Sequence, residues 1–146
     1  MSLKSKYETI LSKLKSKIES TPTISSEKIP VWIGGKIPIE EPTSVFIVPT
    51  PIRLEPITIE PTRTCTVEFE IAVVKKIKET SASALSQAEK DTALLACEIV
   101  DTLHSDITLE DTVRELRVTT IAPVYELIGD YRVFGASITV ELLFEL

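Results

Sequence analysis

Hydrophobic and polar residues alternate most strongly in two stretches of the chain, residues 64–77 and residues 134–145. A period of two residues is typical of a strand with one buried face. The apolar positions are Cys65, Val67, Phe69, Ile71 and Val73 in the first stretch, and Phe134, Ala136, Ile138, Val140, Leu142 and Phe144 in the second. Both stretches are therefore predicted to be strands of a sheet with one apolar face.

Two other stretches repeat with the period of a helix. Residues 4–19 and 87–104 are predicted helices, and Ser86 with Glu89 has the spacing of a capping box at the start of the second one. The apolar stripes are Tyr7, Ile10, Leu11, Leu14 and Ile18 in the first helix, and Ala88, Thr92, Leu95, Ala96, Ile99 and Leu103 in the second. We expect both stripes to cover the apolar face of the sheet.

Glycine and proline mark the region between the first helix and the strand at residue 64. Gly34 and Gly35 separate two apolar runs within residues 31–39, which predicts a tight β-hairpin. Pro30 and Pro38 place this hairpin at an edge of the sheet or projecting from it, because proline cannot donate to a ladder. Seven of the nine prolines lie in residues 30–61, so this region is predicted to be irregular.

Short strands are expected at residues 44–48 and 52–59, and a further strand at 112–122. A loop is expected over 123–131, because it contains Pro123 and Gly129-Asp130.

The order of these elements predicts an α+β fold. We expect a mainly antiparallel sheet, an N-terminal helix and a central helix packed on one of its faces, and a projecting β-hairpin. The 146 residues fit a single domain over 1–146. Its parts are the helix 4–19, the hairpin and Pro-rich extension 30–61, and a strand-helix-hairpin core over 64–146.

Charge is unevenly distributed along the chain. The net charge is −6, which disfavours a surface that grips nucleic-acid phosphates. Residues 1–36 hold seven Lys and three acidic residues, whereas residues 79–146 hold thirteen acidic residues and four Arg or Lys. Such polarity lets copies or neighbours meet through opposite charges. Solvated faces that keep the domain soluble are an equally open interpretation.

Candidate catalytic and ligand-binding groups are sparse. His104 is predicted in the last helical turn as a capping residue, and Cys65 and Cys97 are expected to be reduced and buried, so neither a triad nor a metal cluster is expected. No cofactor and no enzymatic activity are expected. The alternative left open is a small enzyme or ligand-binding domain that uses the open face of the sheet, with Glu68, Glu70, Glu141 and Arg132.

No apolar run reaches the roughly 18 residues of a membrane span, and the start of the chain lacks the apolar core of a secretory signal. We therefore expect a soluble intracellular protein with no membrane partner.

Surface residues of the predicted hairpin and the central helix are the candidate contacts with other subunits. Trp32 either folds back on the core or anchors a contact, and Leu94 projects from the polar side of its helix as a contact or as a singly exposed leucine. The candidate contact residues are Trp32, Ile33, Lys36, Ile37, Arg53 and Leu94.

Four stretches carry a resemblance of organisation to a known family: 7–11 in the first helix, 65–74 in the first strand, 93–103 in the second helix and 135–144 in the last strand. With these elements in this order, the chain resembles the tail terminator and tail completion proteins of long-tailed bacteriophages. This family forms rings that close the tail tube and join it to the head.

The resemblance implies a structural protein of the virion tail, present in the host cytoplasm during assembly. Its partners would be copies of itself, with a hexamer expected, together with tail-tube and head-connector proteins. DNA would pass through the lumen without being held, as an acidic protein allows. A different virion joint, such as a head-closure or baseplate component, remains the alternative within this class.

Overall fold

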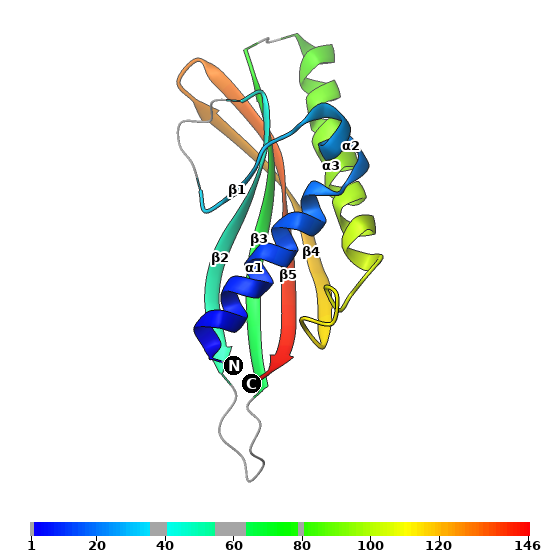
Figure 1. Cartoon of the computed structure of the whole chain (residues 1–146). Helices are drawn as coiled ribbons and strands as arrows, with labels where there is room; N and C mark the ends of the chain where they lie inside the picture. Colours follow the sequence, from blue (N-terminus) through cyan, green and yellow to red (C-terminus); the bar gives the residue numbers. More distant parts are fainter. Residues whose placement is uncertain (1, 36–40, 55–63, 79–80) are drawn as a thin grey trace.

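The computed structural model describes residues 2–35, 41–54, 64–78 and 81–146 (Figure 1). In chain order the elements are α1 (Leu3–Glu19), α2 (Pro22–Glu27), β1 (Val31–Ile33), β2 (Thr43–Leu54), β3 (Thr64–Ile77), α3 (Ala82–His104), β4 (Glu115–Ile128) and β5 (Tyr131–Glu145). The strands form one sheet in the order β1-β2-β3-β5-β4. All neighbours are antiparallel except β1 and β2, which are parallel. The predicted α+β class is confirmed.

β3 and β5 form the centre of the sheet, as their alternating sequences predict. They pair without interruption from Thr64↔Glu145 to Ile77↔Arg132. The predicted bounds of β3 are those of the structure, and its five predicted apolar positions are buried. In β5 the alternation of buried and half-buried residues extends from Ala136 to Phe144, while Phe134 is only half-buried.

Both long helices pack on the same face of this sheet, which we call the helix face (Figure 1). α3 buries the six predicted stripe residues from Ala88 to Leu103. It begins earlier than predicted, because the side chain of Ser81 accepts a hydrogen bond from the Ala84 amide and caps the helix there. The prediction of a capping box at Ser86 was therefore wrong, because Ser86 lies inside the helix.

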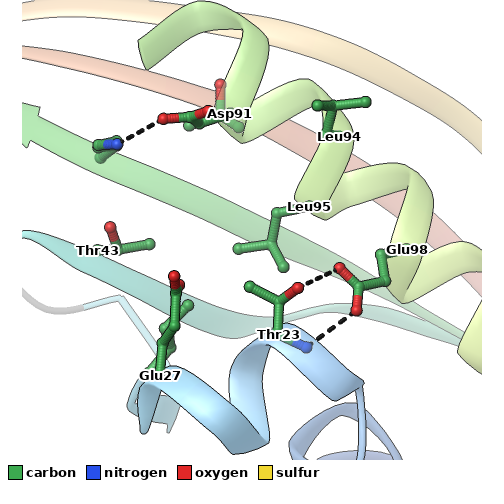
Figure 2. Close-up of a pocket in the computed structure, with 10 residues that line it drawn as sticks. Thr23, Glu27, Thr43, Asp91, Leu94, Leu95 and Glu98 are labelled. Carbon is green, nitrogen blue, oxygen red and sulfur yellow. Dashed lines mark hydrogen bonds and ion pairs between the residues drawn. The ribbon is translucent and has the colours of Figure 1, made fainter. Parts of the chain in front are cut away.

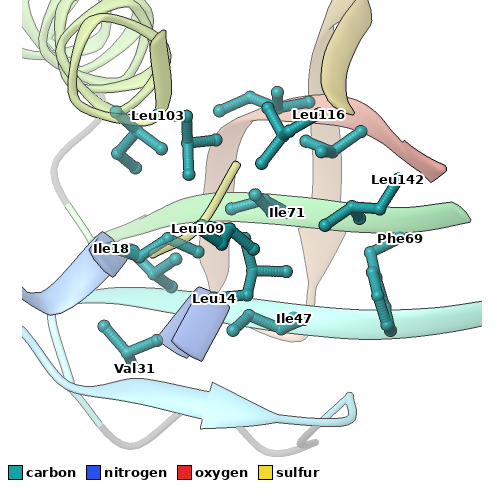
Figure 3. Close-up of a cluster of buried hydrophobic side chains, with 14 of the residues drawn as sticks. Leu14, Ile18, Val31, Ile47, Phe69, Ile71, Leu103, Leu109, Leu116 and Leu142 are labelled. Atoms are coloured by element: carbon teal, nitrogen blue, oxygen red, sulfur yellow. The ribbon is translucent and has the colours of Figure 1, made fainter. Parts of the chain in front are cut away.

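The core is a continuous cluster of aliphatic and aromatic side chains between the helices and the helix face (Figure 3). α1 contributes Leu14 and Ile18, and α3 contributes Leu103. They meet Ile71 and Leu142 of the two central strands. Complete burial of such a side chain favours folding by about 1.5–3 kcal/mol, so this contact fixes the helices on the sheet.

β2 runs as one strand through Pro49 and Pro51, where an irregular region was predicted. The ladder to β3 shifts its register between Pro49 and Ile52, which accommodates the two prolines. β1 pairs only with Val45–Ile47, so neither proline has a described strand on its outer side and no ladder bond is lost there. The expected residues 55–59 of this strand lie outside the described part of the chain.

Among the described strands β1 lies at an edge of the sheet, as the flanking prolines indicated, and its described neighbour is β2 in parallel, with Ile33 opposite Ile47. The predicted return arm of the hairpin, residues 36–39, lies outside the described residues.

At the opposite edge, β4 continues to Ile128, and a turn at Gly129-Asp130 leads into β5. The prediction of a loop from Pro123 onward was wrong. Pro123 lies within β4, and an edge strand tolerates the missing N–H of proline.

Candidate subunit interfaces

The edge strand β1 exposes two of the predicted contact residues. Trp32 is 40% exposed and Ile33 is 49% exposed. Ile33 pairs with Ile47 on the helix face, whereas Trp32 pairs with Phe46 on the opposite face. Two large apolar side chains are therefore partly exposed at this edge, one on each face. The candidates Lys36 and Ile37 lie outside the described residues.

The other two candidates lie elsewhere and do not join β1 in one surface. Arg53, near the end of β2, places Nη2 3.2 Å from Oε2 of Glu68 on β3. Arg53 is exposed and Glu68 is half-buried, so this pair stabilises the fold by less than about 1 kcal/mol. Leu94 is 57% exposed on α3. Sequence spacing alone could not show that these residues lie on separate elements of the surface.

A second exposed apolar surface lies on β4, and sequence reasoning missed it. Ile121, Tyr125 and Leu127 are 43%, 55% and 67% exposed. Their partners in β5 are Ile138, Phe134 and Arg132, and the alternation along β5 places all three on the helix face. We call these residues the β4 strip. The signal was present in the odd-numbered apolar positions 121, 125 and 127, but Pro123 had favoured a loop.

The β4 strip is held in a defined position by the hairpin that β4 makes with β5. The ring of Tyr125 packs on that of Phe134, with centroids 5.0 Å apart and an interplanar angle of 54°. Tilted aromatic contacts of this kind contribute about 0.5–1.5 kcal/mol beyond the area they bury. The strip is therefore an ordered apolar surface on an edge strand.

A row of isoleucines crosses the whole sheet and joins the two edges. Ile33 pairs with Ile47, Ile47 with Ile71, Ile71 with Ile138, and Ile138 with Ile121. The three central members are fully buried beneath the helices, and the two terminal members are exposed. The row ends in an incompletely covered apolar side chain at both edges.

A cavity of about 250 Å³ lies between α2, α3 and the start of β2 (Figure 2). Glu98 of α3 closes one side by accepting hydrogen bonds from the backbone N and Oγ1 of Thr23, at 2.9 and 2.6 Å. Lys75 of β3 closes another side, with Nζ 2.8 Å from Asp91 Oδ2. Leu94 stands at its rim.

The polar groups of this cavity are largely engaged with one another. Hydrogen bonds from Lys75, and then from Gln87, hold the pKa of Asp91 below its ordinary value of 3.8. The carboxylate of Asp91 is therefore charged at neutral pH and fixes α3 to β3, while Glu98 fixes α3 to α2. These two contacts attach α3 to β3 and to α2.

The helix-free face of the sheet, which we call the opposite face, carries the acidic residues of the alternative enzymatic interpretation. Glu68 and Glu141 are directly opposite in the ladder, and Glu70 follows on the same face. Arg132 pairs with Leu127 on the helix face, so its predicted place on the acidic face was wrong. The hollow beside Glu141 measures about 60 Å³, whereas ligand pockets usually hold about 300–1,000 Å³.

The remaining candidate chemical groups are separated from one another. His104 lies in the last turn of α3, as predicted, and Cys65 is buried. Cys97 is exposed, which corrects the expectation that it is buried, because it falls outside the six-residue stripe of α3. Among the residues that the structure describes, no three His, Cys, Asp or Glu side chains lie close enough together to hold a metal ion.

Across the described helices, none combines the length and apolar character that crossing a membrane requires. No protein-family model and no curated protein matches the chain. Among solved structures, the chain is similar to one described as the virion of a native gene transfer agent particle. The two share 10% sequence identity and a TM-score of 0.38, and the match covers 89% of this chain and 84% of that chain. A likeness at this level of identity and TM-score shows neither a family nor a function.

Proposed function

We propose that this chain is a structural virion protein that assembles head to tail into a ring, closing a phage tail tube and joining it to the head. The observation that carries the proposal is the pair of exposed apolar surfaces at the two ends of the strand order, Ile33 on β1 and the β4 strip. Two different surfaces on one chain suit a heterologous contact, and repeated heterologous contacts produce rings when the rotation closes.

The distribution of charge supports the same arrangement. α1, which contacts β1, carries five Lys and two Glu. α3, which contacts β4 and β5, carries four acidic residues and one Lys. A head-to-tail contact brings the basic half of one copy to the acidic half of the next, and such complementarity favours association and fixes its orientation.

The opposite face of the sheet suits a lumen through which DNA passes. Glu68, Glu70 and Glu141 place carboxylates there, and only Glu68 among these three has an ion pair within the described residues. Repulsion between like charges disfavours the binding of DNA phosphates to this face. In this proposal the ring, with six subunits expected, carries no catalytic activity and requires no cofactor. A head-closure or baseplate joint would share these features.

The proposal is tested by size-exclusion chromatography with light scattering, followed by electron microscopy of the purified protein. Rings, in solution or on isolated tail tubes, are the expected result. A chain that stays monomeric at its highest soluble concentration and does not bind tail tubes contradicts the proposal. The position of the gene, between capsid and tail genes or beside baseplate genes, separates a terminator from another virion joint.

A further inference from the structure

We infer that the ring contact is made edge to edge, with Ile121 on β4 of one copy placed beside Ile33 on β1 of the next. This inference rests on the proposed function and names the surfaces by which a second copy binds. Its starting point is the isoleucine row, whose three central members are covered on both sides and whose two ends are exposed. A second copy placed at either edge would cover the exposed end.

The backbone of both edges is suited to this contact. β1 and β4 are the first and last strands of the sheet, so each presents an outer row of N–H and C=O groups with no described partner strand. Such rows accept a further strand. Direct partners in a ladder point to the same face of a sheet. Ile33 and the β4 strip both lie on the helix face, so joining the edges places their side chains in contact without inverting either copy.

The distribution of charge favours a second copy of this chain as the partner at these edges, and it favours contact between β4 of one copy and β1 of the next. Contact between two β4 edges would bring together the two halves that carry α3 and the exposed acidic residues Glu126 and Asp130, while Glu115 is paired with Arg117 on the same strand. Contact between β4 and β1 brings that half to the lysines of α1 and to exposed Lys28. The heterologous contact is therefore favoured over the two-fold contact by the sign of the charges.

Cysteine cross-linking tests the contact directly. In a Cys97→Ser background, one protein carries Ile33→Cys and another carries Ile121→Cys. Direct partners in a ladder have Cα atoms about 4.5–5.5 Å apart, within the range of a disulfide. Oxidation of the mixture should produce a covalent heterodimer, and the double variant should produce a covalent ladder that ends at the size of the ring. Leu94→Cys mixed with Ile33→Cys is the matched control, because Leu94 is more exposed than Ile121 but lies on α3.

The outcomes separate this inference from the proposed function. Rings that form without the 33–121 bond, or a bond between two copies of Ile121→Cys, overturn the edge-to-edge contact and leave the ring intact. A protein that forms no oligomer and no cross-link overturns both. Ile121→Glu is the second test: it should abolish the ring while the melting temperature of the subunit stays unchanged, since the side chain is exposed. A ring that persists in Ile121→Glu overturns the inference.

Discussion

Gly135 on β5 lies against the backbone of Val73 on β3, so closely that a Cβ atom at Gly135 would stand 2.5 Å from the Val73 carbonyl oxygen. A side chain at this position requires the two central strands to separate. Gly135→Ala should therefore lower the free energy of unfolding by about 1–3 kcal/mol, measured by urea denaturation. Gly35→Ala is the control, because a Cβ there meets no atom within 4 Å. Equal stability of the two variants would contradict this explanation.

The centre of the fold could be predicted from sequence because each element there carries a complete periodic pattern. β3 and α3 bury one regular face each, and the buried positions from Cys65 to Val73 and from Ala88 to Leu103 followed from period alone. Burial of a regular face is a local property that the residues themselves encode. The α+β arrangement followed from the order of these elements.

The edges could not be predicted because strand neighbours decide them. Pro123 was taken as the start of a loop, although it lies within β4, where the outer side of the strand needs no N–H. β1 was expected to pair with the residues after Gly35, and its described neighbour is β2. The candidate Arg53 turned out to pair with Glu68, and the β4 strip was missed. The exposed contact surfaces depend on which strands lie at the edges of the sheet. The hydrophobic periodicity of a single segment does not determine that strand order.

Thr21 is fully buried, and its hydroxyl has no hydrogen-bond partner among the residues the structure describes. An unsatisfied buried hydroxyl costs about 1–3 kcal/mol, so Thr21→Val should raise the melting temperature, measured by calorimetry. Thr92→Val is the matched control. The hydroxyl of Thr92 donates to the carbonyl oxygens of Ala88 and Glu89 on α3, so its loss should leave stability unchanged or lower. A fall in melting temperature for Thr21→Val would show that its hydroxyl is bonded.

The two hydrogen bonds from Thr23 to Glu98 attach α2 to α3. Thr23→Val removes only the bond from Oγ1, whereas Glu98→Ala removes both bonds, so a double-mutant cycle of these two variants isolates the hydroxyl bond. The coupling energy should be about 1 kcal/mol, because the site is partly buried. The free energy of unfolding is measured for all four proteins. A second cycle, with Thr23→Val and Glu89→Ala, serves as the control, since Glu89 is exposed on the same helix. A coupling energy near zero would mean that the hydroxyl bond of Thr23 does not stabilise the attachment of α2 to α3.

The ion pair between Lys75 and Asp91 should make stability depend on pH in the acid range. The pKa of Asp91 is lowered in the folded protein by the hydrogen bond from Lys75 and then by that from Gln87. The unfolded chain therefore binds this proton more readily. The stabilisation is complete above the ordinary value of 3.8 and is lost as the pH falls through the lower folded value.

Asp91→Asn should thus be less stable than the unsubstituted protein near pH 7, by less than about 1 kcal/mol because the pair is partly exposed. The difference between the two proteins should stay constant down to about pH 5 and shrink below about pH 4. Urea denaturation across this range measures it. Asp101→Asn, an exposed acid on the same helix, is the matched control. The opposite result would be a stability difference between Asp91→Asn and the unsubstituted protein that grows as the pH falls. It would mean that protonated Asp91 stabilises the fold more than the carboxylate does, so that the contact between α3 and β3 does not depend on the charge of Asp91.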